Sequence, residues 1–244
     1  MAMALSARFA PAVGAVSASR LVTATLDSTD ELYDYDALRR ITEPTEFVVH
    51  VQQPTVVLGS RQRASLLTEG FRSSVALRRR RGGGGMVLLQ PEDLWVDWWI
   101  PAADARWSRD LRDTSHRAGN WWRTALSDDV ATDFVVHTGP LEVDSRYDVV
   151  CFAGRGPGEV FADARKAVGV TQWRVREGAF VSTVLHGHST APLLKGLVDC
   201  PAGLADVLGH HTIESLKIGN PDAVVRRLTS IGGPWSTRHL LLTD

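Results

Sequence analysis

The stretch Arg78-Arg79-Arg80-Arg81-Gly82-Gly83-Gly84-Gly85-Met86-Val87 carries the strongest local signal in this 244-residue sequence. Consecutive glycines can adopt positive φ and let backbone N–H groups approach a ligand closely, so the loop can form an anion-binding concavity. The arginines add planar donors that suit a carboxylate or a phosphate. No Walker A or Rossmann spacing is present. A hairpin tip with solvated arginines is the alternative interpretation.

Strand-like segments flank this loop on both sides. Residues 47–51 and 55–58, separated by Pro54, predict two strands of a meander, and residues 75–77, 86–89 and 94–100 predict three more. Further along the chain, extended structure is expected at residues 130–137, 147–152 and 159–161. Residues 168–174 can pair with residues 180–185 as a hairpin.

Helices are expected between these strands. Ser28 and Glu31 form a capping-box signature for a helix over residues 28–41, and apolar spacing predicts a second helix over residues 108–126. From residue 191 onward the chain predicts short helices broken by proline and glycine. Hairpin-connected strands with inserted helices favour an α+β fold with a mixed, largely antiparallel sheet. We expect residues 1–20 to form a flexible extension and residues 21–244 to form a single domain.

Composition excludes several classes of function. The formal net charge is −1, so no global field draws the protein to nucleic acid or to an anionic membrane, although seven arginines lie between Arg61 and Arg81. Two cysteines are too few for a disulfide framework, and no apolar run approaches the length of a membrane span. The sequence therefore predicts a cytoplasmic protein without nucleic-acid or membrane partners.

Lysine is rare in this chain, which draws attention to Lys166. Of 27 basic residues only Lys166, Lys195 and Lys217 are lysine. Lys166 follows a predicted tight turn and precedes a predicted buried strand, where a compact ammonium could point into a site. A solvated charge on a hairpin is the alternative interpretation.

Cys151 closes the apolar run Tyr147-Asp148-Val149-Val150-Cys151-Phe152. Such a cysteine is commonly a small core residue. The functional alternative is an acyl-carrying nucleophile, which needs a neighbouring cation or base. His186 and His188 alternate and are expected on one strand face, but no acidic or thiol partner with metal spacing is nearby, so the sequence assigns no metal site.

The tryptophans form a group that predicts core packing between helix and sheet. The alternative for the same residues is the wall of an apolar acyl slot. The group consists of Trp95, Trp98, Trp99, Trp107, Trp121 and Trp122.

Three segments together resemble the lipoate side of the biotin/lipoate protein ligase superfamily. Residues 53–59 with Gln62 resemble its Pro-x-Val-x-hydrophobic-Gly-x-x-Gln segment, residues 79–87 its Arg-Arg-x-x-Gly-Gly-Gly-x-Val loop, and residues 165–172 its Arg-Lys-hydrophobic-x-Gly-x-Ala-Gln segment. Order and spacing both fit, and the similarity spans roughly residues 21–188. Leu89-Gln90 replaces the His-Asp that usually follows the glycine-rich loop.

The resemblance implies a lipoate-protein ligase that activates lipoate or octanoate with ATP and Mg²⁺ as an acyl-adenylate. The acyl group would pass to a lysine of a lipoyl-carrier domain or of a glycine-cleavage H-type carrier protein. Lys166 would be catalytic and would stabilise negative charge. The residues implied to bind substrate and nucleotide are Arg79, Arg80, Gly83, Gly84, Gly85, Val87 and Gly169.

Two alternatives stay open at this point. Cys151-Phe152, Glu159 and Lys166 have the spacing of a Cys-Phe...Glu...Lys stretch in cysteine-dependent octanoyltransferases. In that case Cys151 would carry the acyl group as a thioester, and neither ATP nor Mg²⁺ would be needed. The second alternative is a non-catalytic binding domain of the same fold.

Overall fold

The computed structural model describes residues 21–24, 31–127, 132–163, 165–211, 218–233 and 235–242 of the 244-residue chain. The predicted extension at residues 1–20 and Ser28 of the predicted capping box lie outside the described residues.

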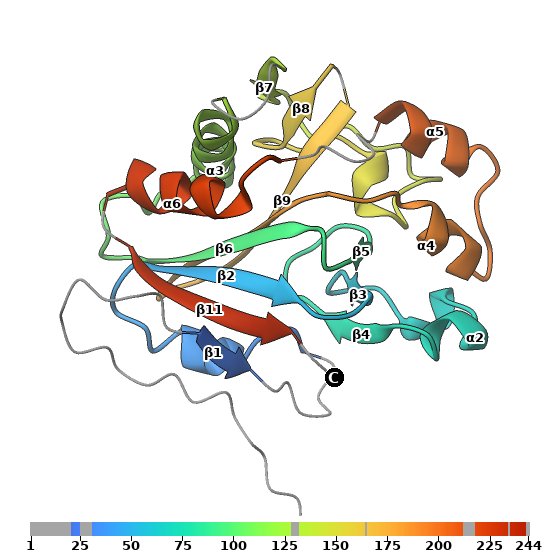
Figure 1. Ribbon diagram of the computed structural model, residues 1–244, viewed down its shortest axis with the longest axis horizontal. Coiled ribbons are helices and arrows are strands. Elements are labelled where there is room, and N and C mark those ends of the chain that lie inside the picture. Colours follow the sequence, from blue (N-terminus) through green and yellow to red (C-terminus); the bar gives the residue numbers. More distant parts are fainter. Residues whose placement is uncertain are drawn as a thin grey trace, which may run out of the picture.

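An eight-stranded sheet forms the centre of the fold, in the order β1-β11-β2-β6-β10-β9-β8-β7 (Figure 1). Strands β1, β11 and β2 run parallel to one another, and every other neighbouring pair is antiparallel. The predicted α+β class with a mixed, largely antiparallel sheet is confirmed. The strands are β1 Leu21–Ala24, β2 Thr45–Val51, β6 Leu94–Pro101, β7 Phe134–Val136, β8 Val160–Ala162, β9 Arg165–Val175, β10 Gly178–Leu185 and β11 Ser236–Leu242.

A smaller sheet packs beside the first and consists of β4 (Ala76–Arg79), β3 (Thr55–Leu58) and β5 (Val87–Leu89) in that order. Strands β2 and β3, predicted as neighbours in a meander, therefore belong to different sheets. That prediction is wrong because both edges of β2 are occupied, by β11 and by β6. The chain leaves the large sheet before Pro54 and starts the small one at Thr55.

The central strand β6 supplies side chains to two hydrophobic cores, because successive residues of a strand point to opposite faces. Trp95 and Trp99 pack in the core that includes the small sheet, whereas Val96 and Trp98 pack against helices on the other face. There the ring of Trp98 meets that of Trp121 edge-on at 5.2 Å. The predicted core role of the tryptophans is confirmed, since Trp95, Trp98, Trp99, Trp121 and Trp122 are all buried.

Helices α3 (Leu111–Leu126) and α6 (Pro221–Ile231) cover one face of the large sheet (Figure 1). The Asp110 carboxylate caps α3 by accepting a hydrogen bond from the Arg112 amide, so the predicted helix over residues 108–126 is confirmed with a slightly later start. The other helical elements are α1 Tyr35–Leu38, η1 Ala64–Leu66, α2 Glu69–Arg72, η2 Cys151–Ala153, α4 Ala191–Gly196 and α5 Leu204–His211.

The predicted helix over residues 28–41 is wrong, because within the described residues 31–41 only Tyr35–Leu38 is α-helical, with Asp34 as its N-cap. Glu31 instead forms a bridge with Arg79, and the Leu32 amide donates to the Arg79 carbonyl. Pairing with the edge of β4 thus overrides the local helical pattern.

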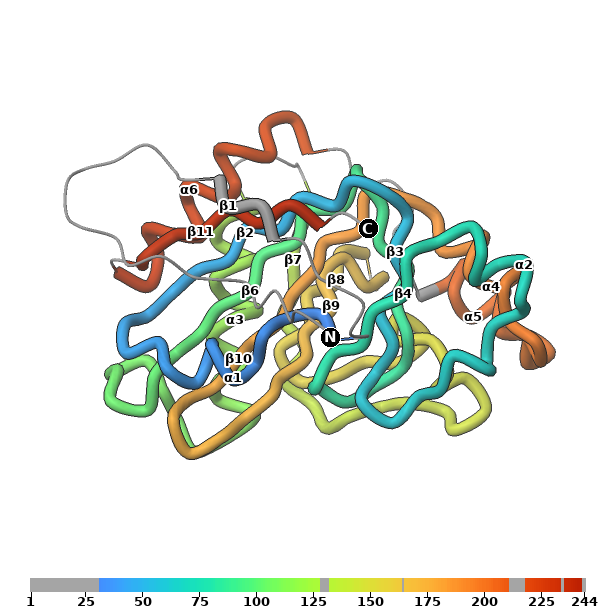
Figure 2. Tube along the Cα trace, turned by 90° about the horizontal axis from the view of Figure 1, so that it is seen from below, coloured from blue at the N-terminus to red at the C-terminus, as the bar shows by residue number. Residues whose placement is uncertain are grey.

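The predicted strand over residues 147–152 is also wrong, because these residues form a turn followed by the 3-10 helix η2. The Met86 amide donates to the Val149 carbonyl, and the Cys151 amide donates to the Met86 carbonyl. The segment is thereby attached to the end of the glycine-rich loop. Figure 2 shows this part of the chain, in yellow, beside the small sheet.

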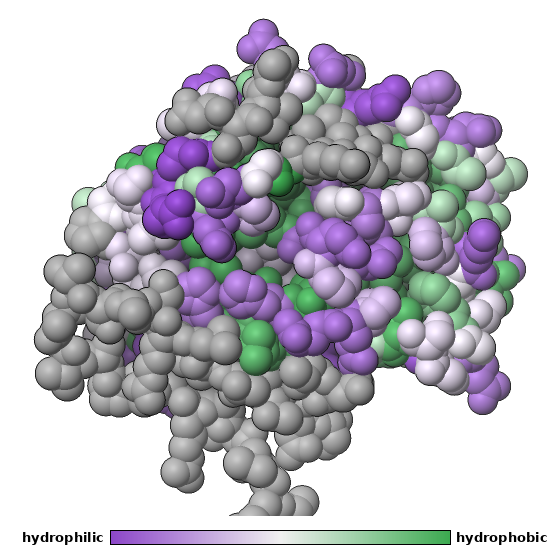
Figure 3. Space-filling view, viewed as in Figure 1, coloured by the Kyte–Doolittle hydropathy of each residue, from purple (hydrophilic) through white to green (hydrophobic). Residues whose placement is uncertain are grey.

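The C-terminal strand β11 was not predicted, since the sequence after residue 191 indicated only short helices. It fills the space between β1 and β2 through parallel pairing on both sides. Among the described helices, of which α3 is the longest with 16 residues, none has the length and apolarity of a bilayer span. On the face shown in Figure 3, hydrophobic residues form separate patches among hydrophilic ones.

A buried carboxyl in β6 makes stability depend on pH. Asp97 is fully buried and accepts hydrogen bonds from the Tyr33 hydroxyl (2.7 Å), the Trp95 indole (2.6 Å) and the Thr183 amide (2.9 Å). Burial raises the pKa of Asp97 to about 7, although these hydrogen bonds oppose the shift. The folded state therefore keeps a proton that the unfolded state releases near pH 4, and this contribution to stability is lost as pH rises towards 7.

We predict that Asp97→Asn, which imitates the protonated carboxyl, gains stability relative to the original protein between pH 4 and pH 7. The gain is expected to reach about 4 kcal/mol across this window. Urea unfolding at several pH values measures it, with the exposed Asp199→Asn as the control. Parallel stability curves for Asp97→Asn and the original protein would contradict the prediction.

Candidate active site

The glycine-rich loop joins β4 to β5 and packs against the segment that follows β3. Gly84 has φ of +90°, which favours glycine, and a Cβ added at Gly59 would lie 1.9 Å from the Gly84 carbonyl oxygen. The Gln62 side chain accepts a hydrogen bond from the Gly59 amide at 3.0 Å and donates to the Val149 carbonyl at 2.9 Å. The segment of residues 53–59 with Gln62 and the glycine-rich loop therefore form one structural unit.

The guanidinium of Arg80 lies beneath the loop and holds its carbonyl oxygens. Arg80 is 4% exposed and donates to the carbonyls of Gly83 (2.8 Å), Gly85 (2.6 Å) and Val57 (3.3 Å). Among the described residues no protein acceptor is found for the amide N–H groups of Gly83 and Gly84, which are exposed. Carbonyls bound on one side and free amides on the other make the loop a place for an anion.

The two arginines that flank Arg80 are also engaged with the protein. The guanidinium of Arg79 donates to the carbonyls of Gln62 and Gly59. Arg81 forms an ion pair with Glu31 at 3.1 Å and lies over the ring of Tyr35. In this structure the arginines of the motif support the loop, and their predicted contact with a bound nucleotide stays a prediction.

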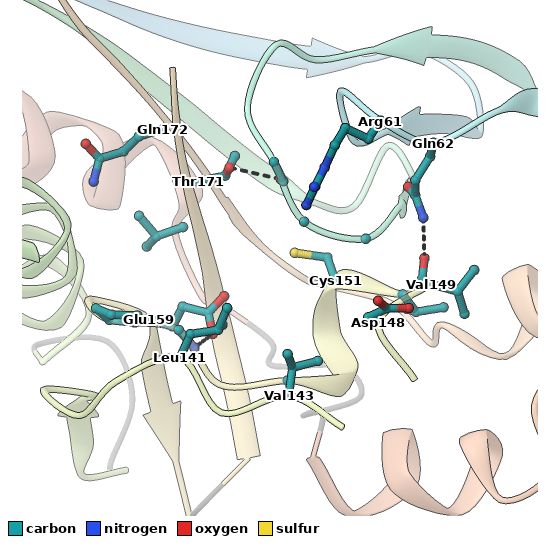
Figure 4. Close-up of a pocket in the computed structure, with 18 of the residues that line it drawn as sticks. Arg61, Gln62, Leu141, Val143, Asp148, Val149, Cys151, Glu159, Thr171 and Gln172 are labelled. Atoms are coloured by element: carbon teal, nitrogen blue, oxygen red, sulfur yellow. Dashed lines mark hydrogen bonds between the residues drawn. The ribbon is translucent and has the colours of Figure 1, made fainter. Parts of the chain in front are cut away.

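A cavity of about 820 Å³ opens in front of the loop (Figure 4). Arg61 extends alongside the loop in this view, and Arg61, Arg63 and Arg112 all line the cavity. Among the described residues no carboxylate pairs with Arg61 or Arg63. These cations were missed as site residues, although the basic stretch from Arg61 onward was the signal that could have found them. The exposed apolar side chains along the cavity are Leu66, Leu111, Leu141 and Val143.

A narrow apolar slot of about 30 Å³ lies next to this cavity and shares Cys151, Val170 and Thr171 with it. A Cβ on Gly169 would lie 3.0 Å from the ring of Phe152, so the glycine keeps the slot open. Of the six tryptophans, Trp95 lines the slot. The other side chains that line it include Leu32, Val57, Val87, Leu89 and Val184.

Lys166 lies in β9 with its ammonium between the cavity and the protein interior. Its side chain is 1% exposed, and Nζ lies 2.7 Å from Glu159 Oε2, 3.0 Å from the Cys151 carbonyl oxygen and 5.1 Å from the centre of the Phe152 ring. The alternative of a solvated hairpin charge is wrong. Because an ammonium has three donors and two of them have protein acceptors, one N–H is available to a ligand.

Cys151 stands where the cavity and the slot meet. Figure 4 shows its sulfur extending from η2 into the space enclosed by the loop, Thr171 and Glu159. The residue is half-buried and free, and it lines both spaces. The structure thus brings together Lys166, Cys151, Gly83 to Gly85 and Gly169, all of which the sequence analysis singled out, with Val87 in the wall of the slot.

Two polar residues of β9 were not singled out in the sequence and also line the cavity. The Thr171 hydroxyl donates to the Gly83 carbonyl at 3.3 Å and so ties β9 to the loop. The Gln172 amide donates to the Ser115 hydroxyl at 2.5 Å and to the Leu111 carbonyl at 2.8 Å, which fixes the start of α3. They close the far side of the cavity.

His186 and His188 follow β10 and do have an acidic partner, so the sequence interpretation is wrong on this point. Asp93 Oδ1 lies 2.8 Å from His188 Nδ1 and 3.3 Å from His186 Nδ1. The pairing of β6 with β10 brings Asp93 to the histidines across more than 90 residues of sequence. Burial would raise the pKa of Asp93, but the hydrogen bonds from both histidines outweigh burial and hold that pKa well below its usual range.

Comparison with known proteins supports the predicted resemblance in fold to the lipoate-protein ligases. No protein-family model matches the chain, and no curated protein sequence matches it. Solved structures do match: lipoate-protein ligase A bound with ATP (TM-score 0.62, 14% identity, 86% of this chain and 82% of that chain). Ta0514 of T. acidophilum with bound lipoic acid has a TM-score of 0.61, 13% identity, and coverage of 86% and 82%.

A structure of a bi-partite lipoate protein ligase and its E2 lipoyl domain from Thermoplasma acidophilum is similar as well. It has a TM-score of 0.61, 16% identity, and coverage of 86% of this chain and 80% of that chain. At these identities the likeness establishes the fold. The chain has the fold of the lipoate-protein ligases, over most of its own length and of theirs.

The buried ion pair between Lys166 and Glu159 should show strong coupling in stability. Lys166→Met leaves a carboxylate without its cation in the interior, and we expect it to cost about 3 to 5 kcal/mol. The double variant Lys166→Met/Glu159→Gln removes both charges and should be more stable than Lys166→Met alone. Chemical denaturation of the single and double variants measures the coupling free energy.

The exposed pair Arg117–Asp113 on α3 is the matched control for this cycle. Its variants Arg117→Met and Asp113→Asn should couple by less than about 1 kcal/mol, because solvent screens the two charges. Equal coupling in the buried and exposed pairs would show that Lys166 does not depend on Glu159.

Proposed function

We propose that this protein is a lipoate-protein ligase-like enzyme. It would activate lipoate or octanoate with ATP and attach the acyl group to a lysine of a lipoyl-carrier domain or an H-type carrier protein. The observation that carries the proposal is the meeting, at one cavity, of the Lys166 ammonium, the free amides of the glycine-rich loop and an apolar slot.

The apolar lining of the slot and the exposed apolar side chains along the cavity suit the hydrocarbon chain of the acid, of which the slot of about 30 Å³ admits only a part unless its side chains move. Burying methylene groups there is favourable by roughly 0.8 kcal/mol each. At the mouth of the slot, where Cys151 and Thr171 line both spaces, the acid's carboxylate comes within the cavity that Lys166 also lines. The remaining N–H of the ammonium can donate to a carboxylate oxygen, so Lys166 would orient the acid as well as balance its charge.

The free amides of Gly83 and Gly84 suit the phosphates of ATP, and Arg61 and Arg63 add unpaired positive charge beside them. The acid's carboxylate oxygen would attack the α-phosphorus and release pyrophosphate. Mg²⁺ prefers one or two carboxylates together with substrate phosphates, and the exposed Asp148 in the cavity wall would be able to supply one. Bound there, Mg²⁺ would neutralise part of the phosphate charge.

In the second half of the reaction, the lysine amine of the carrier would attack the acyl carbon and release AMP. The negative charge that develops on the acyl oxygen would be stabilised by Lys166, whose position is fixed before the reaction. Neighbours with lipoic acid, with ATP and with a lipoyl domain support this choice of substrates and partner.

A second function is favoured by the position of Cys151 between the cavity and the slot. In a cysteine-dependent octanoyltransferase, the Cys151 thiolate would attack the carbonyl of an octanoylated carrier and release the carrier. A lysine amine of a second carrier would then attack the thioester and free the thiol. Lys166, which already donates to the Cys151 carbonyl, would support the oxyanion in both steps.

Mass spectrometry separates these functions. With ATP, Mg²⁺ and octanoate or lipoate, the ligase should release pyrophosphate and hold an acyl-adenylate, and Cys151→Ala should retain this activity. With an octanoylated carrier alone, the transferase should gain one octanoyl mass on Cys151, whereas the exposed Cys200 serves as the control thiol. If folded protein gives neither product, both enzymatic proposals fail and a non-catalytic binding domain is left.

Both enzymatic proposals require the compact ammonium of Lys166. We predict that Lys166→Arg lowers turnover about a hundredfold to a thousandfold, because a planar guanidinium cannot occupy the same buried position between Glu159 and the ligand. Lys195→Arg, on the exposed face of α4, should leave turnover unchanged. Steady-state rates measured on variants with matched circular dichroism spectra test this, and full activity of Lys166→Arg would remove Lys166 from the mechanism.

A further inference from the structure

Asp93, His186 and His188 form a second group of titratable side chains behind the proposed acyl site. Asp93 directly precedes β6, and the two histidines directly follow β10, where Leu94 pairs with Leu185. All three side chains are at least nine-tenths buried. One potential ligand atom from each lies within 4.8 Å of those of the other two.

A single carboxylate oxygen is surrounded by more donors than it can accept well. Asp93 Oδ1 is approached by His188 Nδ1 at 2.8 Å, by the Gly187 amide at 2.8 Å and by His186 Nδ1 at 3.3 Å. An ionised carboxylate offers about two acceptor directions on each oxygen. A cation that replaced the imidazole protons would relieve this crowding with little movement, because ligands of a tetrahedral metal ion also lie about 3 Å apart.

The outer nitrogens of the two rings make no hydrogen bond that would hold the rings in place. His186 Nε2 and His188 Nε2 are both buried and have no hydrogen-bond partner among the described residues. The polar contacts of both rings are therefore made by the Nδ1 atoms, which face Asp93 here and would face the ion in an occupied site.

We propose that Asp93, His186 and His188 bind one divalent transition-metal ion, with Zn²⁺ as the best match to two imidazoles and one carboxylate. Mg²⁺ and Ca²⁺ fit poorly, because they prefer oxygen ligands throughout. Three protein ligands leave a position for water, which the slight exposure of His188 permits.

The proposed ion would fix the connection between β10 and α4 behind the acyl site. The ring of His186 packs on that of Phe152 with centroids 4.0 Å apart, and Phe152 lies beneath the Lys166 ammonium. The site lies outside the cavity and the slot that the proposed ligase reaction uses. Its occupation is therefore a separate property, and metal binding can be measured without turnover.

Cobalt provides the direct test. Full-length protein without an affinity tag, stripped with a chelator, should bind one equivalent of Co²⁺ with visible absorption bands of a low-coordinate N/O site, and Zn²⁺ should displace it. In His188→Gln the affinity should fall at least about a hundredfold, since loss of a direct ligand exceeds the 10- to 100-fold effect of outer-shell changes. The control is His239→Gln, whose ring stacks on His50.

Failure of the original protein to bind Co²⁺ and Zn²⁺ stoichiometrically would overturn the proposal, as would equal affinity in His188→Gln and His239→Gln. If His188→Gln does not fold, X-ray absorption of the zinc-loaded original protein decides. Two imidazole nitrogens with oxygen ligands are expected there, and a shell with sulfur or without two imidazoles would contradict the site.

Discussion

The side chain of Lys166 is 1% exposed, so protein groups must replace the water that would otherwise hydrate its ammonium. The arrangement of the site follows from this need. An ammonium taken from water into the interior costs several kcal/mol unless a countercharge and hydrogen bonds replace its hydration. Glu159 provides the countercharge, the Cys151 carbonyl accepts a second hydrogen bond, and the Phe152 ring lies below. These contacts hold strand β9, the turn before β8 and the 3-10 helix η2 together at one point, where they form the floor of the cavity.

A second buried cation, Arg80, lines the adjoining slot and is used in the opposite way. Its guanidinium donates hydrogen bonds to the backbone carbonyls of Gly83, Gly85 and Val57. Because the carbonyls are bound beneath, the amides of Gly83 and Gly84 are left for a ligand. Arg80 therefore shapes the backbone on which an anion could bind, while Lys166 keeps one N–H that could donate to a ligand directly.

The sequence predicted those parts of the fold that depend on local pattern: most of the strands, the helix capped by Asp110, and the clustering of Lys166, Cys151 and the glycine-rich loop. It failed where a distant partner decides. Glu31 and Leu32 pair with Arg79, Cys151 binds the backbone of Met86, and β11 inserts between β1 and β2. Asp93 reaches His186 and His188 only because β6 pairs with β10. The spacing of residues along a short stretch of sequence does not reveal these contacts.

In the proposed function, the apolar slot is the part of the site that could distinguish one acid from another. Leu89 stands where the related motif usually has a histidine, and the other residues that line the slot are mostly apolar. Contacts with a hydrocarbon chain in the slot would therefore depend mainly on the length and width of that chain. Gly169 is the position where added volume would meet the Phe152 ring directly. The polar residues that line the slot are Arg80, Thr171, Ser182 and Thr183, whereas Lys166 and the loop glycines Gly83 to Gly85 line the adjoining cavity. In the proposed reaction, selectivity for the acid would thus come from the space that the slot can offer, and reactivity from the Lys166 cation in the adjoining cavity.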